Sequence, residues 1–296
     1  MKVKPECAIC LVKRAVQEIS LAASEESKRL EAVNAIFKMA CKQFNQGSIP
    51  ANLGTERYRL IRKVTGAGDY YKNLKKLANF HAMKIVEGLR AKINSIRDSY
   101  QRFRRAAVAA IAGNAMEFFV LDNDFKIEDI NRILTEAERE MAVDDLPELF
   151  QFILKKPRIL YLTDNAGEIA FDTLLIEQLK ALGAEITVAV KDKPIMNDAT
   201  LEDAEAVNMS LYATRVITTG TDSVGLSVKD CSDEFLSYFY SSDLIIAKGM
   251  GYYETISEIK LKKPLALLLR AKCKPVAEDL KVVQNKNIAK FLKNTS

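Results

Sequence analysis

Two short polar segments in the second half of the chain contain side chains that can ligate a metal ion. The first, DNAGE, places Asp164, Asn165 and Glu168 directly after an apolar run. The second, PIMNDAT, contains Asp198 and follows the next apolar run. Carboxylate and amide oxygens are the ligands that hard divalent cations such as Mg²⁺ or Mn²⁺ prefer. If the two segments meet in space, their residue types predict a divalent-cation site.

Positive side chains and glycines follow the later apolar runs. Lys248 follows residues 244–247, and both Arg270 and Lys272 follow residues 264–269. These three side chains could hold phosphate oxygens, and the glycines after Lys248 would let backbone amides approach the same group. A cation, a phosphate and positive side chains together are the components of phosphoryl transfer.

The apolar periodicity of residues 156–296 predicts a Rossmann-like α/β domain that would bring these segments together. Short continuous apolar strands alternate with helical segments, a pattern typical of a parallel sheet that is covered on both faces. Strands are expected at 158–162, 185–190, 215–218, 244–247 and 264–269, and helices at 169–182, 201–209, 232–239 and 252–261. In such sheets ligands bind at the carboxyl ends of the strands, where all the polar segments are expected.

Residues 1–155 differ in composition and pattern, and they predict an all-helical N-terminal region. Between residues 5 and 154 apolar residues recur at helical spacing among Ala, Glu, Lys, Arg and Leu. About seven helices are expected, with breaks near 47–50, 66–69 and 121–124. Because no low-complexity linker separates the two regions, the expected fold class is α/β. The helical region would pack on a doubly wound α/β/α sandwich with a mostly parallel sheet.

The first polar segment has alternative interpretations. Asp164 and Asn165 stand at a strand-to-helix junction, where such residues often only cap the helix N-terminus. A dinucleotide or methyl-donor site would need the pattern G-x-G-x-x-G, but the segment contains a single glycine, Gly167. Glu168 would in addition repel a pyrophosphate. The residue types therefore favour a metal site over a nucleotide site, and the capping role stays open.

Composition argues against several other classes of protein. The 44 basic and 39 acidic residues give a net charge of +5, too small an excess to indicate a nucleic-acid partner without a basic patch. No apolar run reaches the roughly 18 to 20 residues of a membrane span, and MKVKPECAIC does not resemble a signal peptide. We therefore expect a cytoplasmic protein with neither a nucleic-acid nor a membrane partner.

Cysteine and histidine offer few further candidates. Five cysteines are an odd number that does not indicate a disulfide framework, and the single histidine, His81, lies in a helical stretch as a structural residue would. Cys7 and Cys10 form a CxxC pair. The pair could be reduced and structural, could form a soft-metal site that Cys41 and His81 would complete, or could act in redox chemistry.

Four segments of the chain together resemble the family called domain of unknown function 89. They are DNAGE (164–168), PIMNDAT (194–200), KGMGYYE (248–254) and LLRAKCKPVA (268–277). The resemblance continues in the helical half through Glu6–Cys10, Thr55–Tyr71 and Ala112–Phe118, and it is strongest with an archaeal branch that carries the CxxC pair. Members of this family are metal-dependent damage-control phosphatases, related to a protein once proposed to be an acidic-residue methyltransferase. The resemblance implies a helical region followed by an α/β/α sandwich.

The resemblance also implies roles for individual residues. The metal ligands would be Asp164, Asn165 and Asp198, holding Mn²⁺, Mg²⁺ or another first-row divalent ion such as Ni²⁺ or Co²⁺. For the substrate phosphate, the resemblance implies contacts from the 248–254 loop, which contains Gly251, Tyr252, Tyr253 and Glu254, and from Lys272. From the residue types we add Asn165 and Arg270 as substrate contacts, and we expect Asp164, Glu168 and Lys248 to be the catalytic residues. Two positions depart from the family pattern, since Tyr252 stands where asparagine is expected and Glu117 stands where aspartate is expected.

These roles predict a metal-dependent phosphatase that acts on a small phosphorylated metabolite, such as a sugar phosphate. The cation would polarise the phosphoryl group, and Lys248 and Lys272 would stabilise the charge on its oxygens. Glu168 would either orient another group or take a proton from water, and Asp164 would either bind metal or act as the nucleophile. Two other functions stay open: a non-catalytic sugar-phosphate or nucleotide binding protein, and a methyltransferase that uses S-adenosylmethionine.

Overall fold

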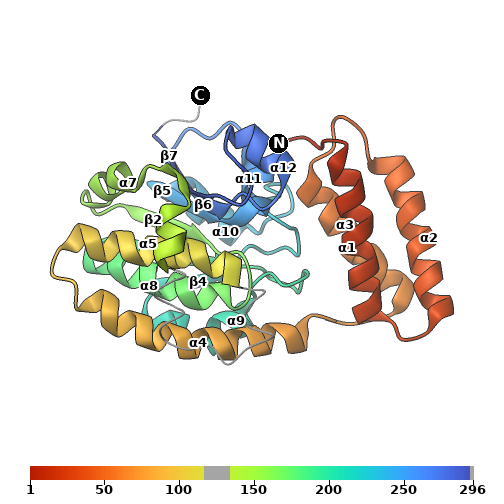
Figure 1. Cartoon of the computed structure of the whole chain (residues 1–296), viewed down its shortest axis with the longest axis horizontal. Helices are drawn as coiled ribbons and strands as arrows, with labels where there is room; N and C mark the ends of the chain where they lie inside the picture. Colours follow the sequence, from red (N-terminus) through yellow and green to blue (C-terminus); the bar gives the residue numbers. More distant parts are fainter. Residues whose placement is uncertain (117–133, 294–296) are drawn as a thin grey trace.

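The computed structural model describes residues 1–116 and 134–293 of the chain. Within these residues seven strands form one sheet in the order β1-β7-β6-β5-β2-β3-β4 (Figure 1). The strands are β1 (Met141–Asp144), β2 (Arg158–Leu162), β3 (Glu185–Val190), β4 (Arg215–Thr218), β5 (Leu244–Lys248), β6 (Leu265–Arg270) and β7 (Asn287–Leu292). Neighbouring strands are parallel except β6 and β7, which are antiparallel. The expected mostly parallel sheet is therefore confirmed.

The strands agree with the apolar pattern wherever a continuous apolar run exists. β2, β3 and β4 have the predicted bounds, β5 extends one residue further, and β6 is displaced by one residue. The pattern does not predict β7, which contains the polar residues Asn287 and Lys290, or the short strand β1, whose residues alternate between half-buried and exposed. Because β1 lies within residues 1–155, the prediction that this region is all helical is wrong at that point.

Helices cover both faces of the sheet, as a doubly wound α/β/α sandwich requires. In the C-terminal half they are α8 (Glu168–Ala181), α9 (Leu201–Ala206), the 3₁₀ helix η1 (Met209–Leu211), α10 (Asp233–Ser241), α11 (Gly249–Ile256) and α12 (Lys274–Leu280). α8 and α10 lie within two residues of the predicted ranges, and two helices differ by three residues or more. α9 ends at Ala206, and α11 begins at Gly249 rather than at residue 252, because the glycines after β5 form the first turn of the helix and not a loop.

The N-terminal half consists mainly of long helices. They are α1 (Glu6–Ala22), α2 (Glu26–Gln43), α3 (Pro50–Thr65), α4 (Lys72–Asn94), α5 (Ser99–Met116) and α7 (Leu146–Ile153), with a further helical segment at 134–139. The predicted breaks at 47–50 and 66–69 separate α2 from α3 and α3 from α4. The predicted break at 121–124 lies outside the described residues, as does Glu117.

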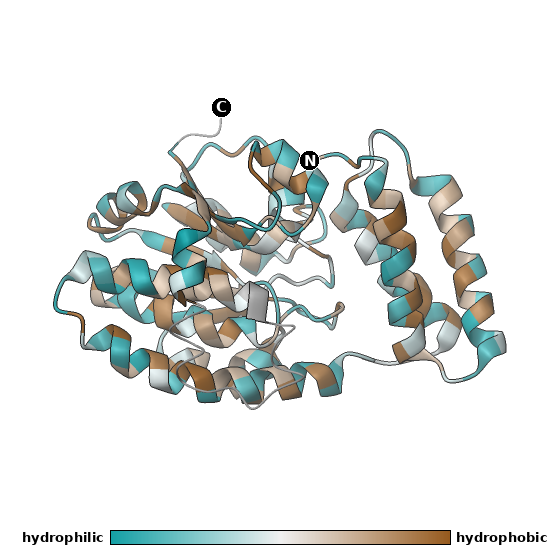
Figure 2. Cartoon of the chain, viewed as in Figure 1, coloured by the Kyte–Doolittle hydropathy of each residue, from teal (hydrophilic) through white to brown (hydrophobic). Residues whose placement is uncertain are grey.

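Three apolar clusters explain how these elements pack. One face of the sheet shares its cluster with α4, α5, α7 and α8, and the other face shares its cluster with α10, α11 and α12. A third cluster joins α1, α2 and α3, which lie together beside the carboxyl end of the sheet (Figure 1). Apolar residues line the inner sides of these helices (Figure 2). The domain boundary after residue 155 stays a prediction. None of the described helices is long and apolar enough to cross a bilayer.

Candidate active site

The loops after β2 and β3 meet at the carboxyl end of the sheet, as the sequence predicts. The backbone N–H of Ala199 donates to the carbonyl oxygen of Asp164 at 2.8 Å. Asn165 and Asp198 face each other across an isolated antiparallel bridge. The structure therefore brings the backbones of the three predicted metal ligands together, because parallel strands end at the same edge of a sheet.

Helix α4 fixes the position of both loops. Gly167, which has a φ of 77°, donates its backbone N–H to Oδ1 of Asn79 at 2.7 Å. Nδ2 of Asn79 in turn donates to Oδ1 of Asp203 at 2.9 Å, and Asp203 caps the start of α9 by accepting from Thr200 at 2.8 Å. One buried asparagine from the N-terminal half thus holds the starts of α8 and α9, the helices that follow the two acidic loops.

The amide of Asn165 joins two acidic side chains. Its Nδ2 donates to Oδ2 of Asp164 at 3.0 Å and to Oε2 of Glu168 at 3.2 Å. Both bonds come from the nitrogen, so the carbonyl oxygen of the amide is the atom with the chemistry to ligate a cation. Asn165 is 8% exposed and Glu168 is 3% exposed, so solvent has little access to these hydrogen bonds.

Gly249 makes room for the Asp164 carboxylate. A Cβ atom at position 249 would lie 1.9 Å from Oδ2 of Asp164, and the residue has a φ of 79°, which L-residues rarely adopt. Only glycine therefore fits between the end of β5 and this carboxylate. The carboxylate lies at the first turn of α11, where the partial positive charge of the helix N-terminus stabilises it.

Negative charge accumulates around Asp164. Burial raises the pKa of this carboxyl well above its usual range, and the nearby charges of Glu168 and Asp198 raise it further, while Lys272 and Lys248 act in the opposite direction. A divalent cation between the carboxylates of Asp164 and Asp198 would remove this repulsion, and hard oxygen donors suit such an ion. The residues present therefore fit the implied metal. Within residues 1–116 and 134–293 no three Asp, Glu, His or Cys side chains form a complete ligand set, so the amide of Asn165 is needed as the third donor.

Lys248 lies beneath this site and is bonded to three protein groups. Its fully buried ammonium donates to Oε1 of Glu168 at 2.6 Å, to Oδ1 of Asp172 at 2.7 Å and to the carbonyl of Ala110 at 3.0 Å. Burial alone would lower the pKa of Lys248, but the two carboxylates raise it above its ordinary value. Since a lysine has three protons to donate and all three are engaged, a phosphate contact would require one of these bonds to break.

Asp172 is a buried member of the site that the sequence reasoning missed. It follows Glu168 by four residues on α8, so both acids share one face of the helix and reach the same ammonium. Its Oδ1 also accepts from the hydroxyl of Tyr161 at 2.7 Å. Burial raises the pKa of Asp172 to about 6 despite the lysine. A single acid inside the apolar stretch 169–176 is the signal that could have identified it.

Lys191 is a second buried lysine, at the end of β3. Its ammonium donates to the carbonyl of Gly225 at 2.7 Å and to the hydroxyl of Tyr252 at 3.2 Å, and it lies 3.7 Å from Oδ2 of Asp198. The same ammonium stands 4.5 Å from the centre of the Tyr252 ring. Tyr252 was predicted to contact substrate, yet it is 1% exposed and contacts Lys191 through both its ring and its hydroxyl.

The sequence of residues 3–288 matches the family described as the damage-control phosphatase ARMT1-like domain. The chain belongs to this family. An uncharacterized protein of Methanocaldococcus jannaschii is 38% identical over 97% of this chain and 95% of its own length. A damage-control phosphatase of Archaeoglobus fulgidus is 32% identical over 99% of this chain and all of its own length, and one of Pyrococcus horikoshii is 34% identical over 95% of each.

A solved structure agrees with these relatives. The crystal structure of a DUF89 family protein from Pyrococcus horikoshii superimposes with a TM-score of 0.88 at 32% identity, over the whole of both chains. The resemblance noted in the sequence and the α/β fold class are thus confirmed. Of the three functions that the sequence left open, the family membership and the named relatives support the phosphatase.

Three predicted substrate-binding residues of this phosphatase make structural contacts. The Tyr253 hydroxyl donates to Asp279 of α12. Glu254 accepts from the backbone of Ala51 in α3, and burial raises its pKa to about 7. Arg270 donates to Asn287 at 3.0 Å and also bonds Glu140. These contacts connect α11 and β6 to neighbouring elements, a use that the sequence did not predict.

The remaining predicted substrate contacts lie at the same edge of the sheet. Lys272 is half-buried in the loop after β6, and its charge acts on the pKa of Asp164. Gly251 lies close to the loop after β4, since a Cβ there would be 3.0 Å from the Val224 side chain. Lys272 is therefore the predicted phosphate-binding cation whose position best fits a role toward substrate.

The CxxC pair is reduced in the structure. Cys7, Cys10 and Cys41 are free thiols, and Cys7 is half-buried, which raises its pKa. The soft-metal site that Cys41 and His81 would complete is not formed, because no group of three or more possible ligands converges among the described residues. Of the alternatives for the pair, the structural and redox roles stay open.

Proposed function

We propose that this protein is a divalent-metal-dependent phosphatase that hydrolyses small phosphorylated metabolites, with sugar phosphates as the first class to test. The proposal is supported by the family, by the two relatives named damage-control phosphatases, and by the meeting of Asp164, Asn165 and Asp198 at the strand ends. The meeting of these three residues supports the proposal most directly, since their oxygen atoms suit a hard divalent cation and lie near the positive charge of Lys272.

The metal would be held by the carboxylates of Asp164 and Asp198 and by the carbonyl oxygen of Asn165. When bound there, a divalent cation supplies Lewis acidity toward a phosphoryl oxygen. Mn²⁺, Mg²⁺, Ni²⁺ and Co²⁺ are all compatible with two carboxylates and one amide oxygen. The three donors come from two adjoining loops, so their geometry depends on the backbone bonds between those loops.

Glu168 would position the ligand Asn165 and not act as the base. One of its oxygens accepts from Lys248 and the other accepts from the Asn165 amide. A carboxylate tied at both oxygens is poorly suited to remove a proton from water, but it fixes the orientation of that amide. Lys248 would therefore contribute to catalysis indirectly, by holding Glu168. Lys272 would neutralise the phosphate oxygens as charge develops on them.

The test is phosphate release from a panel of phosphorylated metabolites, with each of the four metals and with a chelator. The expected result is metal-dependent release that the chelator abolishes. Asp198→Asn keeps the shape of the side chain but removes the negative charge that attracts the cation, and it should lower turnover by at least ~10²-fold, on the scale of a lost electrostatic contact. The unfolding midpoint of the variant is the control for folding. Near-wild-type turnover in Asp198→Asn would show that this metal assignment is wrong.

A further inference from the structure

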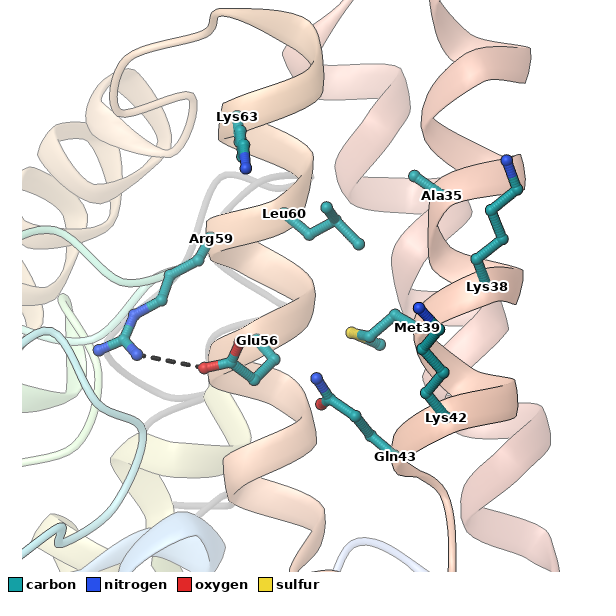
Figure 3. A pocket seen from close by; sticks show the side chains of 9 residues that line it. All are labelled: Ala35, Lys38, Met39, Lys42, Gln43, Glu56, Arg59, Leu60 and Lys63. Atoms are coloured by element: carbon teal, nitrogen blue, oxygen red, sulfur yellow. Dashed lines mark hydrogen bonds and ion pairs between the residues drawn. The ribbon is translucent and has the colours of Figure 1, made fainter.

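A groove of about 440 Å³ runs between α2 and α3, on the part of the molecule formed by α1, α2 and α3 (Figure 3). Its lining residues are Ala35, Lys38, Met39, Lys42, Gln43, Glu56, Arg59, Leu60 and Lys63. Met39 and Leu60 reach into the space between the helices from opposite walls (Figure 3). The groove thus has an apolar floor and a polar rim, and no residue of the candidate active site lines it.

The rim of the groove carries unbalanced positive charge. Four of its residues are cationic, and its single acid, Glu56, lies 3.2 Å from Arg59. Arg59 leaves the groove on the side facing away from α2 and also bonds Asp222 in the loop after β4 (Figure 3). Lys38, Lys42 and Lys63 pair with no acid among the residues that the structure describes. The chain as a whole has 44 basic and 39 acidic residues, so this local excess is not an average property of the surface.

The spacing of these cations disfavours the isolated helices. Lys38 and Lys42 are four residues apart on α2, and Arg59 and Lys63 are four residues apart on α3. Like charges at this spacing lie on one helix face and repel each other. Lys42 and Lys63 stand in the last turns of their helices, where the helix dipole offsets part of this repulsion. An acid at position 42 or 63 would have given an attractive pair instead. An anionic ligand in the groove would supply the missing negative charge.

The extent of the charged zone indicates the size of that ligand. Arg59 points away from α2 and Lys38 lies on the side of α2 that faces away from α3 (Figure 3), so the charged zone that faces the groove is short and consists of Lys42 and Lys63, one from each wall. A helix that docks in a groove needs apolar anchors over two turns, about 10 Å, with charges to match. A compact anion such as a diphosphate or triphosphate fits the shorter zone better than an acidic protein helix does.

We propose that the groove is a second ligand site, for an organic phosphate that carries two or more negative charges and an apolar group. The ammonium groups of Lys42 and Lys63, one from each wall, would bind the phosphate oxygens. Met39 and Leu60 would contact the apolar group. The site is separate from the acidic loops at the strand ends, so its existence does not depend on the proposed phosphatase mechanism.

The test is isothermal titration calorimetry of the full-length protein in EDTA at low ionic strength, with ATP as the probe. We expect saturable one-to-one binding with a Kd below about 1 mM. Tripolyphosphate, which lacks the apolar group, and adenosine, which lacks the charge, should each bind several-fold more weakly than ATP. Added salt should weaken binding, because exposed charges are screened.

Charge-reversal variants distinguish binding in the groove from nonspecific electrostatic attraction of ATP to the protein surface. Lys42→Glu and Lys63→Glu should each weaken ATP binding at least about tenfold. Both positions are exposed, and the attractive i,i+4 pair that each change forms offsets the loss of a cation from the last helical turn; the unfolding midpoint of each variant checks its fold. Lys13→Glu, at an exposed position of α1 outside the groove, is the matched control and should change the Kd less than twofold. Lys272→Met should leave it equally unchanged, because Lys272 belongs to the strand-end site.

Several results would overturn the proposal. They are the absence of saturable ATP binding, equal losses in Lys42→Glu and Lys13→Glu, and loss of binding in Lys272→Met, which would place the ligand at the strand ends. Equal affinity for tripolyphosphate and ATP would refute a role for the apolar floor. If an acidic amphipathic helical peptide bound the groove more tightly than ATP and displaced it, the groove would be a protein-docking surface instead.

Discussion

The carboxyl end of the sheet contains two regions that each bury a lysine, and they neutralise it in different ways. At the end of β5, Lys248 donates to two carboxylates of α8. After β3, Lys191 donates to a backbone carbonyl and a tyrosine hydroxyl, and its nearest carboxylate, Asp198, is 3.7 Å away. Lys248 is thus enclosed by two carboxylates, whereas Lys191 has one carboxylate, that of Asp198, at the distance of an ion pair.

The two side chains differ because they point to opposite faces of the sheet. Successive residues of a strand alternate between faces. In β5, Leu244 and Ile246 belong to the cluster shared with α8, so Lys248 extends to that face. In β3, Ala189 belongs to the opposite cluster, and Lys191 extends the same way, toward α11. A lysine at a strand end therefore bonds to groups of the helix layer that it faces, however far those groups lie along the chain.

The largest expected effect is the loss of stability in Lys248→Met. Removing the ammonium leaves Glu168 and Asp172 buried close together without a counter-charge, and breaking a buried ion pair in this way costs about 3–5 kcal/mol. Urea unfolding of the metal-free protein measures the free energy. The double variant Lys248→Met with Asp172→Asn removes one negative charge as well and should recover part of the loss. A decrease below about 1 kcal/mol in the single variant would contradict the picture of Lys248 as a buried counter-charge.

Lys272 offers the contrast of a lysine that we propose to contact the substrate. Its replacement in Lys272→Met should cost about 2–4 kcal/mol of transition-state stabilisation, the scale of one preorganised donor, with little change in the free energy of unfolding. The cation Kd, measured by calorimetry on the same protein, should stay within a few-fold. A parallel loss of metal affinity and turnover would instead make Lys272 a counter-charge for the acids.

Lys191→Met should have a smaller effect on stability, because the lysine has a single carboxylate nearby. We expect a loss of about 2 kcal/mol in the free energy of unfolding, from two hydrogen bonds left without their donor. Metal affinity should rise a few-fold, since a positive charge beside the ligand Asp198 is removed. Calorimetric titration with Mn²⁺ measures this. A fall in affinity would show that Lys191 positions Asp198 and that its charge matters less.

The sequence predicts the features of this site that depend on strand order and on apolar runs. β2, β3 and β4 have their predicted bounds, and the meeting of Asp164 with Asp198 follows from parallel strands that end at one edge. The direction of a side chain beyond the last strand residue is less predictable, because one residue more or less reverses the face. Lys248, which was predicted to contact phosphate, bonds Glu168 for this reason, since β5 includes that residue.

Other features of the site depend on contacts between residues that are far apart in the sequence, and the sequence alone does not reveal these contacts. Asp172 lies in an apolar helix, and only its pairing with Lys248 gives it a role. The burial of Tyr252 depends on Lys191, which comes from another strand. β7 lies between β1 and β6 although its apolar pattern is weak, and its buried Asn287 is held by the carbonyl of Ala137. Such residues are recognisable only after the strands have been ordered.

The smallest expected effect, and the most direct test of the second lysine, is that of Tyr252→Phe. The change removes the hydroxyl that accepts from Lys191 but keeps the ring 4.5 Å from its ammonium. The free energy of unfolding should therefore fall by only about 0.5–1.5 kcal/mol, the net value of one hydrogen bond. Because the hydroxyl is buried against Lys191, the KM for a phosphorylated substrate should stay within about twofold. If KM instead rises severalfold while stability is unchanged, the hydroxyl contacts substrate, as the family resemblance implies for this position. In that case Lys191 and Tyr252 would belong to the substrate pocket, and the contrast with Lys248 would be one of function as well as of charge.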